Sequence, residues 1–167
     1  MDELEKVFDS LPKLSNKELM QAVENFVYAN EDGVDFIGNG NEIIYPDFCK
    51  YKHSFAEGLY AREMFQPKGT LMVGAIHKHS EVFILLEGKL IIATENEPQE
   101  YIGPCYVVTR AGNKKMGVAL EDCTLLTISS NPTDTQDLDE LENHLYALTW
   151  EEYNEFIKQN SNDEKDK

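Results

Sequence analysis

The sequence lacks several features that would indicate particular functions. Its three cysteines, Cys49, Cys105 and Cys123, are odd in number and include no C-x-x-C pair, which excludes zinc or redox sites of that type. Such thiols suit a reducing compartment, where Cys105 and Cys123 would serve as small core residues. No stretch approaches the roughly 18 uncharged apolar residues of a membrane span. The nucleophile elbow, the P-loop and the Rossmann glycine pattern are also missing.

Basic side chains are scarce as well. Fifteen lysines and arginines stand against 31 aspartates and glutamates, for a net charge of −16. We therefore expect neither nucleic acid nor an anionic membrane as a partner, because both require a basic face. The acidic residues form no single array, which favours a role in solubility over nucleic-acid mimicry. The N-terminus is acidic and no apolar segment follows it, so we expect no signal peptide and a cytoplasmic location.

The length of 167 residues suits one domain, and a hydrophobic share of 41% is sufficient for a core. Residues 1–30 are predicted as a helical extension, with a capping box at Ser15–Glu18. Residues 131–158 are again predicted to be helical, and a second capping box at Thr149–Glu152 opens the last helix. Residues 159–167 contain no apolar side chain and are predicted to be a disordered tail.

Between these ends, residues 31–130 have the pattern of a β domain. Short runs rich in β-branched, aromatic or leucine residues are separated by Gly, Pro and Asn, which is typical of a sandwich or barrel. The run 81–86 is almost continuously apolar, as expected for a strand covered on both faces. The predicted strands are 34–37, 42–45, 58–65, 69–77, 81–86, 89–94, 104–108, 115–120 and 123–129. The predicted fold class is therefore mainly β, a barrel with helices at both ends.

The segment Gly69–Gly88 contains the first candidate functional residues. Three residues separate His77 from Glu81, and six more separate Glu81 from the final glycine. Cupin metal motifs have this spacing: Gly, five residues, His-x-His, three or four residues, Glu, six residues, Gly. Ala75 stands at the first histidine position, so a methyl group replaces one ligand.

A second cupin motif normally supplies the last histidine: Gly, five residues, Pro-x-Gly, two residues, His. In the matching region, which begins at Gly103 with one extra residue, Gly112 takes the place of the turn glycine and Arg110 that of the proline. Lys115 then falls where the histidine belongs. A protonated lysine cannot coordinate a metal and would repel one. Lys115 facing Glu81 would instead form an ion pair inside the barrel, with an ammonium in place of the metal.

The same segment also allows a different assignment of the metal ligands. His77-Lys-His79 is itself a His-x-His, with both rings on one strand face, and Glu81 continues the parity. If the strand runs straight through Ser80, these three side chains gather as ligands of one divalent ion, such as iron, manganese, nickel or zinc. Two hypotheses therefore stay open: this three-ligand metal site, and the degenerate site with Lys115 in the metal's place.

Several segments together give the chain a family resemblance. They are Pro67-Lys68-Gly69, Gly74-Ala-Ile-His77-Lys78-His79, Gly88, Pro104, Ala111-Gly112-Asn-Lys114-Lys115 and Ala119-Leu120-Glu121-Asp122. With them, the segment from about Gly58 to Leu148 resembles the cupin superfamily, and more closely small cupin-like proteins of tailed bacteriophages and prophages. The resemblance implies a cupin-type jelly-roll barrel, a small molecule inside it and a homodimer. It does not settle the function, because cupins include dioxygenases, isomerases, epimerases, sugar binders and sensory domains.

We expect first a non-catalytic ligand-binding or accessory protein, which would lie in the host cytoplasm or the virion if phage-encoded. The candidate ligand-binding residues are His77, Glu81, Arg110, Lys114 and Lys115. The basic members of this set favour a small anionic ligand. The second hypothesis is a metal-dependent enzyme of the isomerase, epimerase or oxygenase class that uses His77, His79 and Glu81. Its metal-free version has His77 as general base and Lys115 as electrophilic partner. The acidic helical ends support a third hypothesis, an interaction protein.

Overall fold

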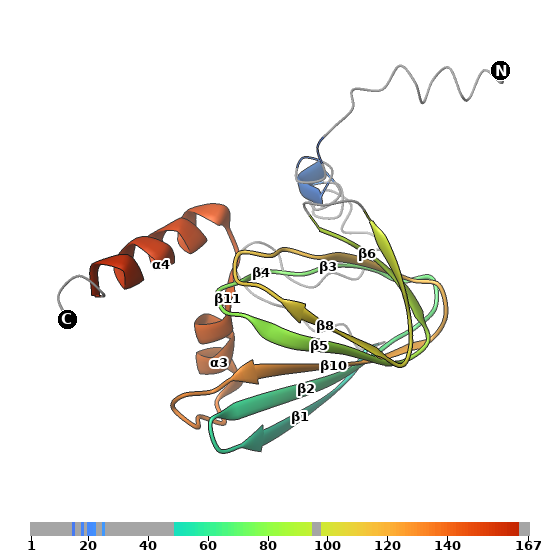
Figure 1. Cartoon of the computed structure of the whole chain (residues 1–167), viewed down its shortest axis with the longest axis horizontal. Coiled ribbons are helices and arrows are strands. Elements are labelled where there is room, and N and C mark those ends of the chain that lie inside the picture. Colours follow the sequence, from blue (N-terminus) through green and yellow to red (C-terminus); the bar gives the residue numbers. More distant parts are fainter. Residues whose placement is uncertain are drawn as a thin grey trace.

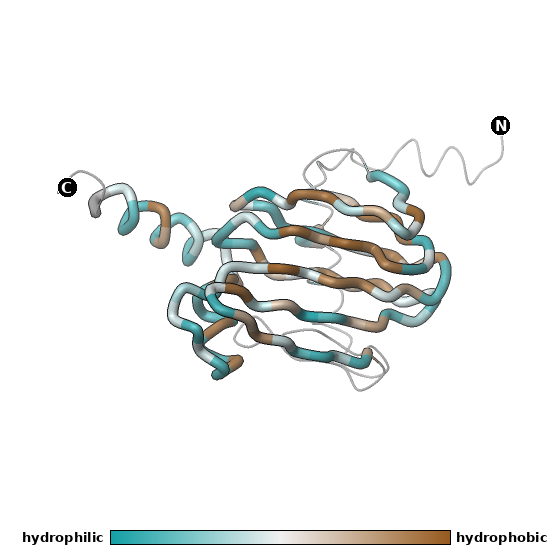
Figure 2. Tube along the Cα trace, turned by 60° about the horizontal axis from the view of Figure 1, so that its bottom comes forward, coloured by the Kyte–Doolittle hydropathy of each residue, from teal (hydrophilic) through white to brown (hydrophobic). Residues whose placement is uncertain are grey.

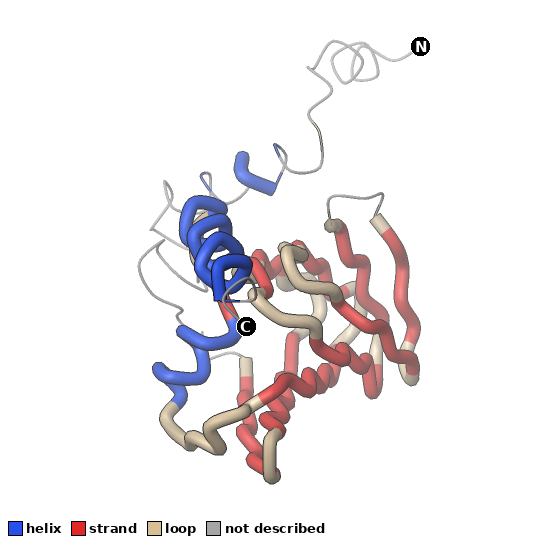
Figure 3. Tube along the Cα trace, turned by 60° about the vertical axis from the view of Figure 1, so that its left-hand side comes forward, coloured by secondary structure: helices blue, strands red, loops and turns tan. Residues whose placement is uncertain are grey.

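The computed structural model describes residues 49–94 and 98–163, together with residues 15, 18, 20–22 and 25. Two antiparallel sheets face each other as a jelly-roll barrel, and the C-terminal helices lie at one end of it (Figure 1). Figure 3 shows these helices beside the strands on the same side of the molecule. The predicted fold class, a mainly β jelly roll with flanking helices, is confirmed.

The larger sheet has five strands. In spatial order they are β1 (Lys50–Ala56), β2 (Leu59–Gln66), β10 (Cys123–Ser130), β5 (Glu81–Glu87) and β8 (Cys105–Thr109). The smaller sheet follows the order β3 (Leu71–Val73), β9 (Met116–Ala119), β6 (Lys89–Ala93) and β7 (Gln99–Ile102). A separate pair consists of β4 (Ile76–His77) and β11 (Tyr146–Ala147). All pairings are antiparallel, so strands far apart in the sequence become neighbours.

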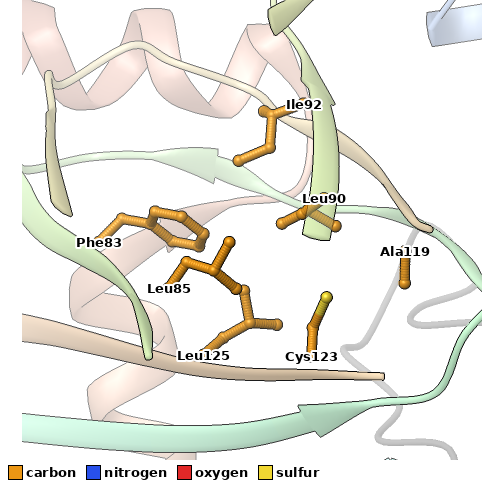
Figure 4. Close-up of a cluster of buried hydrophobic side chains, with 7 residues drawn as sticks. All are labelled: Phe83, Leu85, Leu90, Ile92, Ala119, Cys123 and Leu125. Carbon is orange, nitrogen blue, oxygen red and sulfur yellow. The ribbon is translucent and has the colours of Figure 1, made fainter. Parts of the chain in front are cut away.

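The core lies between the two sheets. Phe83, Leu85, Cys123 and Leu125 point inward from the five-stranded sheet, and Leu90, Ile92 and Ala119 point toward them from the smaller sheet (Figure 4). Each side chain is at most 8% exposed. Burial of a leucine or phenylalanine of this kind stabilises a fold by about 1.5–3 kcal/mol. Cys123 acts as a small core residue, as predicted, and Cys105 packs partly buried against the cluster.

Gly88 links β5 to β6 and occupies the last position of the predicted motif. Its φ is +96°, a conformation that costs energy for residues with a side chain. A Cβ at this position would also collide with the Asp122 carbonyl oxygen and with Cys123. The motif therefore needs glycine here for a structural reason, because this turn brings β10 against the β5–β6 hairpin.

The outer face of the five-stranded sheet is more exposed than the apolar run 81–86 predicts. Along β5, buried and partly buried residues alternate, and Leu86 is 40% exposed. On the neighbouring edge strand, Tyr106 and Val108 are 74% and 61% exposed. Figure 2 shows long hydrophobic stretches on the strands in the middle of the sheet, whereas the edge strand β1 is mostly hydrophilic. The prediction that strand 81–86 is covered on both faces is therefore wrong within the described chain.

The predicted strand 69–77 is interrupted. β3 ends at Val73, and the chain then pairs differently, with the Gly74 N–H donating to the Lys115 carbonyl at 2.8 Å. After the two residues of β4, the chain bends at Lys78 and His79 before β5 begins at Glu81. The physical reason is competition from the C-terminal segment: the Lys78 N–H donates to the Leu145 carbonyl at 2.8 Å instead of continuing a ladder.

The remaining strand predictions differ in smaller ways. The predicted strands 89–94, 104–108, 115–120 and 123–129 agree with β6, β8, β9 and β10 to within one residue at each end. Two strands without a clear apolar pattern, β1 and β7, were not predicted, because both are edge strands with many polar side chains. The predicted strands 34–37 and 42–45 lie outside the described residues.

The C-terminal segment contains α3 (Leu138–Leu145), then β11, then α4 (Trp150–Asp163). The predicted helical region is therefore broken by a strand, and α4 extends past residue 158 into the segment predicted to be disordered. One of the two hydrogen bonds of the predicted capping box at the start of α4 is present, with the Glu152 N–H donating to Thr149 Oγ1 at 3.2 Å, while the Glu152 carboxylate accepts from the Leu148 N–H at 2.9 Å. Among the residues described here, no helix has the length and apolar character needed to cross a membrane.

The N-terminal capping box is also present. The Ser15 N–H donates to Glu18 Oε2 at 2.8 Å, and the Glu18 N–H donates to Ser15 Oγ at 3.3 Å. The described residues that follow Ser15 in this segment, residues 18, 20–22 and 25, are helical. The start of a helix at this point is therefore confirmed, because both ends of the capping box satisfy N–H groups that the first turn leaves without partners.

Candidate functional site

The centre of the candidate site is the carboxylate of Glu81, the first residue of β5. Its side chain is 3% exposed and points into the barrel. The Lys115 ammonium donates to Oε1 at 3.0 Å, and His77 Nδ1 lies 3.3 Å from Oε2. The Ser129 hydroxyl donates to Oε2 at 3.4 Å. Both carboxylate oxygens are thus bound by protein side chains, and the ion pair that the degenerate register predicts is present.

Backbone hydrogen bonds hold these side chains together. The His77 N–H donates to the Asn113 carbonyl at 3.0 Å, and the Gly112 N–H donates to the His77 carbonyl at 2.8 Å. Gly112 has a φ of +80°, so the turn glycine stands where the second motif requires a tight turn. The turn carries Lys115 past β4 and into the barrel. The two motifs, more than 30 residues apart in the sequence, therefore meet through this small backbone network.

Glu81 is ionised throughout the ordinary pH range. Burial alone would raise the pKa of this carboxyl. The hydrogen bond and charge of His77, followed by the charge and hydrogen bond of Lys115, outweigh the burial and lower the pKa of Glu81 to about 2. A group held in its charged form at this depth needs these partners, because an unpaired buried carboxylate is costly.

The environment of Glu81 favours its charged form, whereas the environment of Lys115 disfavours the charged form of the lysine. Burial lowers the pKa of the Lys115 amine below its ordinary value, the Glu81 carboxylate raises it, and the Arg62 guanidinium lowers it further. The net direction is downward. The ammonium also lies 4.8 Å from the centre of the Phe83 ring, so its open side faces an aromatic wall. The Lys115 ammonium therefore loses its proton more easily than that of a surface lysine.

Tyr146 closes the site from the C-terminal side. β11 pairs with β4, so that Tyr146 lies opposite His77 and the two rings meet edge to face at 5.2 Å. The Arg62 guanidinium donates to the Tyr146 hydroxyl at 3.1 Å. Burial raises the pKa of Tyr146 to about 12, so this phenol stays protonated at neutral pH. It is a packing and hydrogen-bonding group rather than a proton acceptor.

The residues at the cupin ligand positions do not fit a divalent ion. Ala75 supplies no donor atom and packs against a cluster that contains Tyr60, Leu141 and Tyr146. Lys115 places a cation 3.0 Å from the carboxylate that would have to bind the metal. Only His77 and Glu81 remain as donors, and the described residues contain no group of three His, Cys, Asp or Glu side chains that could hold a metal. This donor set suits an ion pair, not a metal centre.

His79 lies apart from this site. The straight strand that the three-ligand hypothesis needs is replaced by the bend at Lys78 and His79. The His79 ring stacks on His144 of α3, with ring centres 4.4 Å apart, and touches the edge of Phe156 of α4 at 5.4 Å. The structure therefore brings His77 and Glu81 together and places His79 against the C-terminal helices.

A pocket of about 170 Å³ opens beside Lys115. Among the described side chains that line it, Lys115 alone carries a formal charge. Its ion-pair partner Glu81 is not part of the described lining. The lining residues are Phe83, Ile92, Thr94, Gln99, Tyr101, Val107, Val108, Thr109, Asn113 and Lys115. An engineered cavity of about 150 Å³ is known to hold benzene, so this pocket has room for a molecule of that size. Six of the ten lining residues have polar side chains and four are apolar, so the pocket offers a small molecule both hydrogen-bonding groups and apolar contacts.

The predicted basic cluster is only partly assembled. Lys115 lines the pocket, whereas Arg110 is exposed and Lys114 is buried, and neither belongs to the described lining. Arg110 follows the buried Thr109 at the end of β8, so the strand alternation turns it outward. The structure thus brings together three of the five predicted ligand-binding residues, His77, Glu81 and Lys115.

Four contributors to the site were not predicted from the sequence. Ser129 contacts Glu81 and Thr109 pairs with it because β10 and β8 are neighbours of β5 in space, which no local motif reveals. Tyr146 falls in the segment predicted to be helical, although the apolar run 145–148 just before a capping box is a signal for an extended segment. Arg62 stands on β2, where polar and apolar residues do not alternate regularly, so the sequence does not show which side chains face inward.

No family model and no curated protein sequence matches this chain. Solved structures that resemble its fold include an RmlC-like cupin from Shewanella frigidimarina, with a TM-score of 0.48, 17% identity, and coverage of 57% of this chain and 85% of that one. KdgF from Halomonas sp. has a TM-score of 0.47 and 17% identity over 57% of this chain and 94% of that one. A cupin superfamily protein from Desulfitobacterium hafniense has a TM-score of 0.45 and 8% identity over 52% and 81%. These likenesses concern the fold alone.

Proposed function

We propose that this chain is a cupin-type small-ligand-binding protein in which an internal ion pair replaces the metal centre. The observation that carries the proposal is the 3.0 Å contact of Lys115 Nζ with Glu81 Oε1 at the wall of the 170 Å³ pocket. The positive group faces the pocket, since the Lys115 side chain is 18% exposed and that of Glu81 only 3%. A small organic anion therefore suits this pocket better than a cation or a neutral molecule of the same shape.

The test compares small anions with neutral molecules of the same shape. Propionate and lactate should raise the thermal midpoint of the protein, whereas propionamide should not. A ligand at ten times its dissociation constant stabilises the folded state by about 1.4 kcal/mol. Lys115→Gln should abolish the shift because it removes the positive group. Lys89→Gln is the matched control, since Lys89 pairs with Glu100 on the smaller sheet and lies outside the described pocket lining. Equal shifts with propionamide, or retained binding in Lys115→Gln, would contradict the proposal.

We also propose that the outer face of β5, β8 and β10 binds a second copy of the chain. Outward positions on these strands, such as Leu86, Tyr106 and Leu126, carry no charge. In a chain of net charge −16, an uncharged face is the part that a second copy can approach without repulsion. β8 is also the edge strand of its sheet, so pairing can continue across the interface.

Multi-angle light scattering at high micromolar concentration should give the mass of a dimer for the unmodified chain. Tyr106→Glu should weaken association more than tenfold, because it places a charge on the uncharged face at a residue that is 74% exposed in the single chain. Lys52→Glu makes a charge change on β1, at the opposite edge of the same sheet, and should leave the dimer intact. A monomeric unmodified chain, or equal effects of the two substitutions, would contradict the dimer. The phage accessory role that the motif resemblance implies stays a prediction.

A further inference from the structure

Lys115 differs from an ordinary charged ligand-binding residue in three respects. It lines a pocket that has room for a small organic molecule. It is mostly buried and lies against the Phe83 ring, so its amine has little water around it. Two groups that can exchange protons, the Glu81 carboxylate and the His77 imidazole, form a connected chain on the side away from the pocket. Together these are the conditions under which a lysine reacts with carbonyl groups.

We propose that Lys115 forms an imine with small 2-oxo acids or aldehydes that enter the barrel pocket. This inference rests on the proposed ligand-binding function and adds the chemical class of the ligand and a covalent mode of binding. Pyruvate is a suitable probe, because it has a ketone for the amine and a carboxylate for a pocket without acidic side chains in its described lining. Its few heavy atoms also suit the pocket volume.

The chemistry balances without any further reactant. The ammonium first loses a proton to Glu81 Oε1, which lies 3.0 Å away. The neutral nitrogen attacks the carbonyl carbon, a C–N bond forms, and one of the two amine protons moves to the oxygen to give a neutral carbinolamine. The nitrogen then releases its second proton, the hydroxyl leaves as water with one proton, and the C=N bond forms. The net change is amine plus carbonyl giving imine plus water, with no oxidation or reduction.

His77 has a positioning role in this arrangement. An imidazole that carries its own proton on Nε2 presents the lone pair of Nδ1 to Glu81, 3.3 Å away, so Nδ1 can take the proton onward from the carboxylate. Tyr146 packs its ring against His77 and fixes the orientation of the imidazole. Burial is the main cause that lowers the pKa of Lys115, and a lowered pKa supports the formation of a neutral amine. Glu81 opposes this by stabilising the ammonium, so imine formation should increase with pH.

The test is reductive trapping in the full-length protein. Incubation with pyruvate and sodium cyanoborohydride should add the mass of pyruvic acid less one oxygen atom, and peptide mass spectrometry should place it on Lys115. Labelling there should exceed that of every surface lysine by at least tenfold. An absence of Lys115 labelling, or labelling spread evenly over the lysines, would overturn the proposal.

Two variants separate reactivity from folding and from binding. Lys115→Arg keeps the charge but cannot form an imine, so it should lose the adduct and keep the thermal shift with lactate. Glu81→Gln should move the half-maximal pH of trapping downward by about one unit, because the ammonium loses its carboxylate partner. Lactate has no carbonyl and reports binding alone. A shift with lactate without trapping by pyruvate would overturn the imine and leave the binding function standing, whereas the absence of both would overturn both.

Discussion

Replacing Lys115 with methionine should lower the free energy of unfolding by about 3 kcal/mol at pH 7. The substitution keeps most of the side-chain volume against Phe83 but removes the cation from a carboxylate that is 3% exposed. Breaking a buried ion pair by removing one partner costs about 3–5 kcal/mol, because the other charge stays buried without compensation. The value here should lie at the lower end, since His77 and Ser129 still contact Glu81. Urea denaturation with an unchanged slope would measure it.

A double-mutant cycle tests the cause of this loss. Glu81→Gln combined with Lys115→Met removes both charges, and the double variant should recover most of the stability that Lys115→Met loses. The surface pair of Lys89 and Glu100 supplies the matched control, because its two atoms are also 3.0 Å apart but its side chains are 31% and 47% exposed. Lys89→Met should cost at most about 1 kcal/mol. A similar cost at both lysines would show that the Lys115 pair is not buried in solution.

The spacing of the motif residues could be read from the sequence, and it offered the pairing of Lys115 with Glu81 as one of two open hypotheses. That hypothesis rested on the resemblance of the two segments to cupin motifs, and the 3.0 Å contact in the structure agrees with it. The strands of the core were also predictable, because runs such as 123–129 contain β-branched and leucine residues between clear turn signals. Motif spacing and apolar runs bounded by turn residues can both be recognised in a single sequence.

The course of the chain after His77 could not be predicted in the same way. Whether His79 joins Glu81 depends on a bend that the C-terminal segment imposes through the Leu145 carbonyl, about 70 residues later in the sequence. The local sequence was compatible with a straight strand through Ser80 and with a bend before Glu81. The hydrogen bond from the Lys78 N–H to the Leu145 carbonyl favours the bend. The same holds for Tyr146, whose place beside His77 results from a two-residue strand pair. Long-range pairing of short segments leaves little trace in sequence periodicity.

The ion pair that we propose in place of a metal also has a consequence for the chemistry that this barrel can perform. A divalent ion binds ligands through empty coordination positions, whereas Lys115 presents an amine that is either a charged hydrogen-bond donor or, once deprotonated, a nucleophile. Glu81 controls the balance between these two states, because it holds the proton that has to leave. The same residue is therefore expected to influence stability, ligand binding and reactivity together.

The stability of the folded chain should depend on pH through Glu81. The folded pKa of about 2 lies below the ordinary value of 4.5, so the folded state binds this proton less readily than the unfolded state. The stabilisation is therefore fully present above about pH 4.5 and is lost as the pH falls toward 2. A difference of this size corresponds to about 3 kcal/mol, since each pKa unit is about 1.4 kcal/mol. The other carboxylates of this acidic chain titrate nearby, so the prediction concerns a difference between variants.

The free energy of unfolding of the unmodified chain minus that of Glu81→Gln should be largest near pH 7 and should shrink steadily between pH 4.5 and 2. Denaturant titrations at several pH values would measure this difference, because contributions common to both proteins cancel. Glu100→Gln, on the exposed surface pair, should differ from the unmodified chain by no more than about 1 kcal/mol at pH 7. A difference for Glu81→Gln that stays constant down to pH 2 would mean that Glu81 is not held ionised by Lys115 and His77. The proposal that this ion pair stands in place of a metal would then fail.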